Sequence, residues 1–190
     1  MRLKPLLISG CLSAFMACAV PSWASTVHEC VPGKPTAASY TWDFKAEANQ
    51  LFQAVQSDAD QARYHADQLD TFARDSSLSW DSNAEQLLAL KQEVNDMGRK
   101  LCRLETIRRV VAPWQQAEID RIAKTVRLMA DNTEDAIRFG NSHQENLWLP
   151  VYRKYADNLY AQSCTLANST ENAVTYARLS KELRNLKRDL

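Results

Sequence analysis

Apolar residues recur at intervals of three and four along most of the chain, the spacing of one buried face of an α-helix. The most regular set is Leu87, Leu90, Val94, Met97, Leu101, Leu104 and Val111. It is followed by Ala112-Pro113, where a helix must stop or kink because proline lacks an N–H and clashes with the preceding turn. Residues 87–122 are therefore expected to hold parts of two long amphipathic helices joined at Pro113.

Similar stripes lie on either side of this stretch. Residues 41–74 are expected to form the first helix, and its many alanines suggest close packing against its neighbours. Its apolar positions are Phe52, Val55, Ala59, Ala62, Ala66, Leu69 and Ala73. The helix after Pro113 continues the buried stripe to about Phe139 with Ile119, Ile122, Val126, Met129, Thr133 and Ala136. Gly140-Asn141 then offers a favourable helix stop.

The fourth stripe is the weakest. A short helical turn is expected at residues 142–145, followed by a helix from about residue 149. Its apolar positions are Val151, Tyr155, Leu159, Leu166, Ala173 and Ala177, with Leu183 as an optional last member. The polar run Asn168-Ser169-Thr170 could break this helix, and residues 181–189 are expected to fray. Four such helices predict an all-α, antiparallel up-down-up-down four-helix bundle. The alternative is one long helix kinked at Pro113 in a more extended hairpin.

Two local sequence features refine the prediction of the second helix. Ser82-Asn83-Ala84-Glu85 has the capping-box pattern of a helix start, with serine three residues before glutamate. Gly98 lies inside the helix, where glycine costs about 1 kcal/mol relative to alanine. We therefore expect Gly98 to mark the close approach of a bulky neighbour.

The first residues have the pattern of an export signal. Arg2 and Lys4 precede an apolar run over residues 6–20, and Ser22-Trp23-Ala24 offers small residues for cleavage after Ala24. This divides the chain into a signal peptide (1–24), an extended leader (25–40) and the helical bundle (41–190). The apolar run is too short for a comfortable membrane span, and no second apolar segment follows it. We expect an exported protein, periplasmic or extracellular, without a transmembrane span in the mature chain.

Charge and cysteine content narrow the possible functions. The chain has 23 basic and 23 acidic residues, and removing residues 1–24 shifts the net charge to about −2, which argues against a nucleic-acid partner. The mature chain keeps Cys30, Cys102 and Cys164, and export makes a disulfide plausible. Cys30–Cys102 is the favoured pair, with unpaired buried cysteines as the alternative. Lipid anchoring at Cys11 or Cys18 is less favoured than a cleaved signal.

No constellation of catalytic or cofactor-binding residues is evident in the sequence. It lacks the paired Glu-x-x-His of di-iron bundles, the Cys-x-x-Cys-His of c-type haem, the Gly-x-Ser-x-Gly elbow and any phosphate loop. The sequence therefore predicts no enzyme, no resident cofactor and no metal site. The alternative is a haem- or metal-binding bundle that uses His65, with Met97 or Met129 as a second ligand. A reactive Cys102, activated by the cations around it, is a further alternative.

The most suggestive surface lies at the junction of the two central helices. It combines two guanidiniums, an indole and two amides, which could hold an anionic or sugar-like ligand. Its members are Arg108, Arg109, Trp114, Gln115 and Gln116. The plainer interpretation is that the arginines complement the helix dipole and the tryptophan closes the end of the core.

Three segments carry a resemblance to other proteins. These are Val94-Asn95-Asp96-Met97-Gly98, Leu101-Cys102-Arg103-Leu104-Glu105 and Ala112-Pro113-Trp114-Gln115-Gln116. They resemble an uncharacterised family of bacterial exported helical-bundle proteins, over the four expected helices. The resemblance implies no substrate, cofactor or site residue. The sequence thus favours a non-enzymatic exported bundle that binds or scaffolds a protein or small-molecule partner in the cell envelope, with its oligomeric state open.

Overall fold

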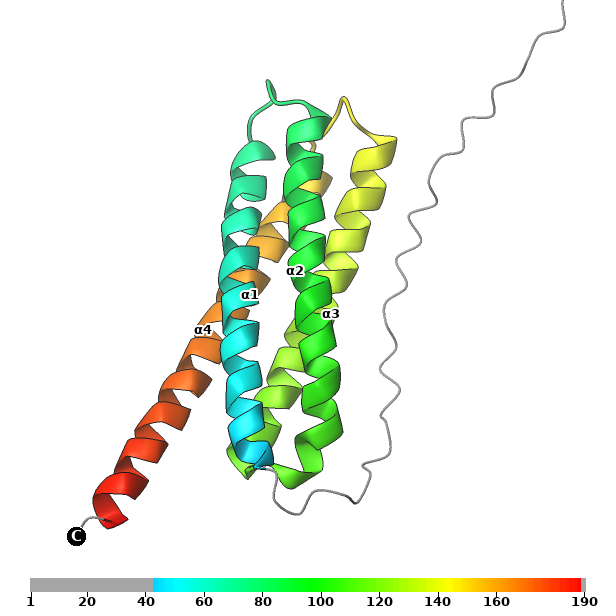
Figure 1. Ribbon diagram of the computed structural model, residues 1–190. Coiled ribbons are helices and arrows are strands. Elements are labelled where there is room, and N and C mark those ends of the chain that lie inside the picture. Colours follow the sequence, from blue (N-terminus) through cyan, green and yellow to red (C-terminus); the bar gives the residue numbers. More distant parts are fainter. Residues whose placement is uncertain (1–42, 189–190) are drawn as a thin grey trace, which may run out of the picture.

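A computed structural model describes residues 43–188, which form a bundle of four antiparallel α-helices (Figure 1). The helices are α1 (Phe44–Phe72), α2 (Trp80–Ile107), α3 (Pro113–Ser142) and α4 (Pro150–Arg188), with a short 3₁₀ helix, η1 (Arg108–Val110), between α2 and α3. Each helix packs against two others in a ring, so that α1 and α3 each lie between α2 and α4. The predicted four-helix bundle is confirmed, and the alternative of one long helix kinked at Pro113 is wrong.

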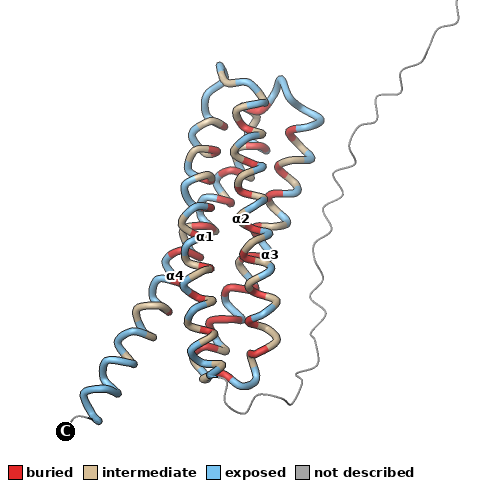
Figure 2. Tube along the Cα trace, viewed as in Figure 1, coloured by how far each residue is buried: buried red, intermediate tan, exposed pale blue. Residues whose placement is uncertain are grey.

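The core follows the predicted stripes of α1, α2 and α3 along the inside of the bundle (Figure 2). Every residue assigned to these three stripes is buried, including Val111 at the junction and the polar Thr133. Thr133 tolerates burial because its hydroxyl donates to the Met129 carbonyl oxygen one turn earlier, at 2.7 Å. Alternation by three and four is therefore a sufficient guide to the buried face of these helices.

Asp43 sets the beginning of α1. Its Oδ1 accepts hydrogen bonds from the backbone N–H groups of Lys45 at 3.0 Å and Ala46 at 3.1 Å, which have no partner inside the helix. The first helix thus begins three residues later than predicted, at Phe44, and ends at Phe72 rather than near Arg74.

α2 begins at Trp80, so the predicted capping box lies inside its first turns. Asn83 from that box is buried instead of exposed at a helix start. Its Nδ2 donates to the Ser79 carbonyl oxygen, and its Oδ1 accepts from the Tyr152 hydroxyl of α4, both at 3.3 Å. The asparagine therefore ties the start of α2 to the start of α4.

The close approach expected at Gly98 occurs at Gly140 instead. A Cβ atom on Gly140 would lie 2.1 Å from Cζ3 of Trp80, whereas a Cβ atom on Gly98 would meet nothing within 4 Å. α3 also continues through Gly140 to Ser142, so this glycine does not end the helix. It admits the Trp80 ring at the top of the bundle. The segment after α3 forms turns without the predicted helical turn.

α4 is one continuous helix of 39 residues, without a break at residues 168–170 and helical through Arg188. Its buried face consists of Tyr152, Ala156, Leu159, Ser163, Leu166, Ala167, Thr170 and Ala173. The predicted stripe was wrong at its start, since Val151 is exposed and Tyr152 is buried, and two of its other members, Tyr155 and Ala177, are only half-buried. None of the described residues of α4 after Ala173 is buried, and this end of the helix diverges from the other three helices (Figures 1 and 2).

Candidate functional site

Gln115 occupies the centre of the junction between α2 and α3, where it makes three hydrogen bonds. Its Nε2 donates to the Lys45 carbonyl oxygen and to Asn49 Oδ1, and its Oε1 accepts from the Ala112 N–H, each at 2.9 Å. The side chain is only 1% exposed. A buried amide that is engaged in this way fastens the start of α3 to the start of α1.

Two neighbouring polar side chains, Arg108 and Gln116, also form hydrogen bonds or ion pairs within the bundle. Arg108 forms a two-pronged ion pair with Asp120, Nε to Oδ1 at 2.7 Å and Nη2 to Oδ2 at 2.6 Å, which lowers the pKa of that carboxyl group. Gln116 Nε2 donates to the Val111 carbonyl oxygen at 3.1 Å. Arg109 is exposed. Ligand binding by this cluster stays a prediction, in which Arg109 would be the most accessible cation.

Trp114 covers the end of the core between two other aromatic rings. Its ring centroid lies 6.0 Å from that of Phe52 in α1 and 4.9 Å from that of Tyr176 in α4. The contact with Tyr176 is edge-to-face, an arrangement that aromatic pairs favour. This packing agrees with the plainer interpretation of the tryptophan, and it marks the level at which α4 leaves the bundle.

His65 is half-buried between α1 and α2 and has a polar partner there. Its Nδ1 lies 3.0 Å from Gln86 Oε1, and its ring stands edge-to-face to Tyr64. Met97 and Met129 are fully buried in the core. Within residues 43–188, no three histidine, cysteine, aspartate or glutamate side chains gather as a metal site would require. Nothing in this geometry favours the haem or metal alternative.

Acidic side chains gather farther along the same interface. Lys100 of α2 pairs with Asp58 of α1. Partial burial raises the pKa of Glu93, and repulsion from Asp58 and Asp96 raises it further. The ionised form of Glu93 is therefore disfavoured by the fold.

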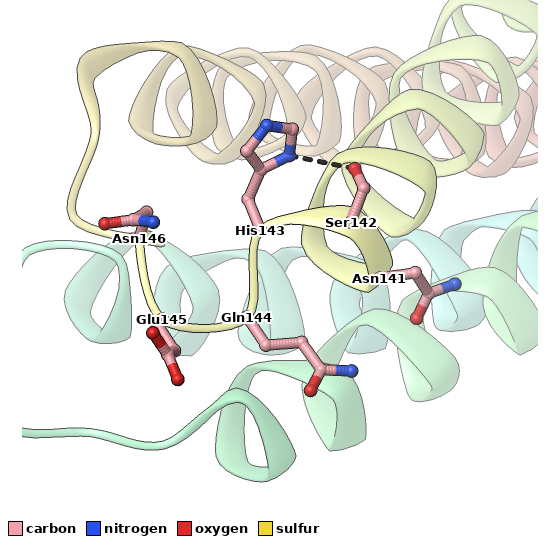
Figure 3. A pocket seen from close by; sticks show the side chains of 6 residues that line it. All are labelled: Asn141, Ser142, His143, Gln144, Glu145 and Asn146. Carbon is pink, nitrogen blue, oxygen red and sulfur yellow. Dashed lines mark hydrogen bonds between the residues drawn. The ribbon is translucent and has the colours of Figure 1, made fainter.

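The α3–α4 loop forms a hollow of about 280 Å³, lined by residues 141–146 (Figure 3). His143 stacks on Phe139 with ring centroids 4.3 Å apart, and its Nδ1 lies 2.8 Å from Ser142 Oγ. The labelled side chains come from one loop and point in different directions, with His143 on one side of the backbone and Gln144 and Glu145 on the other (Figure 3). This divergence is poorly suited to holding a small ligand.

Among the described cysteines, Cys164 is a free, half-buried thiol, so it does not bond to Cys102. Cys30 lies outside the described residues, as do Cys11, Cys18, the signal peptide and the leader. The Cys30–Cys102 pair and the export signal therefore stay predictions.

The clearest surface feature is the end of α4, residues 174–188, called here the α4 arm. It exposes four large apolar side chains: Tyr176 (53% exposed), Leu179 (48%), Leu183 (59%) and Leu186 (62%). They recur at intervals of three, four and three, the a and d positions of a coiled-coil heptad. Contiguous apolar surface of this kind commonly marks an interaction site. We call these four residues the leucine stripe.

Sequence reasoning missed the leucine stripe, although its signal was present. Leu183 was assigned to the end of the core, and the segment around it was expected to fray. Spacing alone cannot tell a stripe that packs on its own bundle from one that extends past it. The length of α4, 39 residues against 28 to 30 for the other helices, makes this distinction.

No helix among residues 43–188 is both long enough and apolar enough to cross a membrane. No protein-family model matches the chain, and no curated protein or solved structure was found to match it. The function is therefore inferred from the geometry of the chain itself.

Proposed function

We propose that this chain is a non-enzymatic bundle protein that binds or scaffolds a partner through the α4 arm, by packing a partner helix against the leucine stripe. The observation that carries this proposal is the exposure of Leu179, Leu183 and Leu186 at a/d spacing on a continuous helix. A partner helix with its own apolar seam would remove these side chains from water. The bundle would hold the arm in helical form, so association would not require the arm to fold first.

Because residues 1–24 are predicted to be an export signal, we propose that this interaction takes place in the cell envelope. Many of the charged side chains elsewhere on the described surface are paired with one another within the bundle. Arg74, for example, follows α1 and pairs with Asp70 of α1 and Asp157 of α4, at 2.9 and 2.6 Å.

Site-specific photo-crosslinking tests this proposal directly. A photo-reactive phenylalanine analogue would replace Leu183 in the full chain, expressed in its native host. The same analogue at Lys181, which is exposed on the opposite side of the arm, is the matched control. We expect a discrete crosslinked product at least about 5-fold more abundant from position 183, since only that side chain would be buried against a partner helix. Equal yields from the two positions, or none from either, would refute the proposed function.

A further inference from the structure

The side of α4 that carries the leucine stripe differs from the side that packs in the bundle. The buried residues Leu166, Thr170 and Ala173 define the inward side. At 100° per residue, the three leucines of the arm lie about 140° around the helix from that side. A second helix could therefore pack on the three leucines without meeting the bundle, while Tyr176, whose ring lies against Trp114, would border both the bundle and the new interface.

Charged residues flank the leucine stripe in a specific order. With Tyr176 and Leu183 at a positions and Leu179 and Leu186 at d positions, Glu182 falls at g and Lys187 at e. In a parallel two-stranded coiled coil, a g residue faces the e residue five positions later on the other chain. Glu182 of each copy would thus face Lys187 of the other, forming two attractive pairs.

The antiparallel alternative lacks this complementarity. Antiparallel strands place g beside g and e beside e. With the same four apolar layers in contact, Glu182 would lie next to its own counterpart, and like charges at such positions are unfavourable. The order of charges therefore selects the parallel, in-register arrangement.

The charges also disfavour a lipid surface as the occupant. An interfacial helix places its basic residues beside the apolar face, where they meet anionic headgroups. Here one acidic residue, Glu182, and one basic residue, Lys187, adjoin the leucines, whereas the other three basic residues of this segment, Lys181, Arg184 and Arg188, lie away from them.

We infer that the partner helix is the α4 arm of a second copy of this chain, and that the two arms form a parallel coiled-coil dimer held by the leucine stripe and by reciprocal Glu182–Lys187 pairs. This inference rests on the proposed function and specifies its partner. Two heptads are fewer than the three to four that usually indicate a coiled coil, and they make a small interface, so we expect a weak dimer.

Sedimentation equilibrium of the purified full chain tests the assembly. The weight-average mass should rise from that of one chain towards that of two as the concentration increases from about 1 to 300 µM. Leu183→Gln should raise the dimer Kd at least about 10-fold, because it removes an apolar side chain from both copies. Leu88→Gln, at an exposed leucine of α2, is the matched control and should leave the Kd unchanged. Unaltered thermal melts would show that the bundle of both variants stays folded.

The reciprocal Glu182–Lys187 pairs can be tested by exchanging their charges. Glu182→Lys and Lys187→Glu should each weaken the dimer about 2- to 10-fold, and the double exchange should restore the original Kd within about 2-fold. Restoration is the result expected only if the two positions face each other across the interface. Additive weakening in the double variant would overturn the reciprocal pairing.

Disulfide trapping tests the orientation. In a Cys164→Ser background, Leu186→Cys should form a dimer linked through position 186 under mild oxidation, because identical d positions meet in a parallel coil. An antiparallel coil would bring position 186 near position 176 and give no such link, which would overturn the parallel arrangement.

The outcomes separate this inference from the proposed function. A protein that stays monomeric at 300 µM, yet crosslinks through position 183 to a different polypeptide in the envelope, would overturn the dimer and leave the proposed function standing. Leu183-dependent sedimentation of a monomer with vesicles of phosphatidylglycerol and phosphatidylethanolamine would overturn both in favour of a lipid surface.

Discussion

Replacing Gly140 and Gly98 by alanine should change stability in opposite directions. Both glycines lie within helices, where alanine is favoured by about 1 kcal/mol. At Gly98 the new methyl group meets nothing within 4 Å, so Gly98→Ala should stabilise the protein by about 0.5–1 kcal/mol.

At Gly140 the same methyl group would stand 2.1 and 2.3 Å from Cζ3 and Cη2 of Trp80. Carbon atoms in contact are ordinarily about 3.5–4.0 Å apart, so the indole ring must move by more than an ångström. Overpacking of this kind costs about 1–3 kcal/mol, which exceeds the gain in helix propensity. We expect a net loss of about 1–2 kcal/mol for Gly140→Ala, equivalent to roughly 2–8 °C in Tm.

Urea unfolding followed by circular dichroism would measure both changes. Because the steric conflict needs the indole ring, Gly140→Ala should become stabilising when it is made in a Trp80→Ala background. If Gly140→Ala stabilises the wild-type protein as Gly98→Ala does, the close approach of Trp80 and the reasoning built on it are refuted.

Three further predictions concern polar and thiol groups. Gln115→Ala should lower the free energy of unfolding by about 2–4 kcal/mol in urea titrations, because it removes three hydrogen bonds that a buried amide makes. A loss below about 0.5 kcal/mol would contradict the structural role of this amide. The raised pKa of Glu93 means that its contribution to stability is greatest below its ordinary value of 4.5 and is lost as the pH rises through its folded-state pKa. Glu93→Gln should therefore raise the Tm at pH 7 and leave it nearly unchanged at pH 3.5, and a Tm gain that is the same at both values would count against burial and repulsion as the cause. Peptide mapping of the exported protein under non-reducing conditions should find Cys30 linked to Cys102 and Cys164 alkylated, whereas a peptide linked through Cys164 would disprove this pairing.

The sequence predicted the parts of the fold that depend on strict periodicity. Each residue assigned to the core of the first three helices is buried, because their stripes alternate without ambiguity. In α4 the choice between Val151 and Tyr152 depended on a hydroxyl partner, Asn83, that lies 69 residues away. Tertiary contacts of this kind are not encoded in local spacing.

The junction shows the same limit for the candidate site. Gln115 lies against the start of α1, where it bonds Lys45 and Asn49. Sequence spacing could not show that the Gln115 amide would be occupied by Lys45 and Asn49, since both partners precede it by more than 60 residues. The Trp80–Gly140 contact was missed for the same reason, and its glycine was interpreted as a helix stop.

The buried amide of Gln115 also determines which alignment of the helices is the native one. An alanine-rich face such as that of α1 could slide by one turn, about 5.4 Å, and still bury similar side chains. Such a slide would carry the Lys45 carbonyl and Asn49 away and leave the amide buried without partners, at a cost of about 1–3 kcal/mol for each group. The glutamine thus penalises misaligned bundles more than it strengthens the correct one. This side chain therefore contributes more to the uniqueness of the folded state than to its free energy of unfolding.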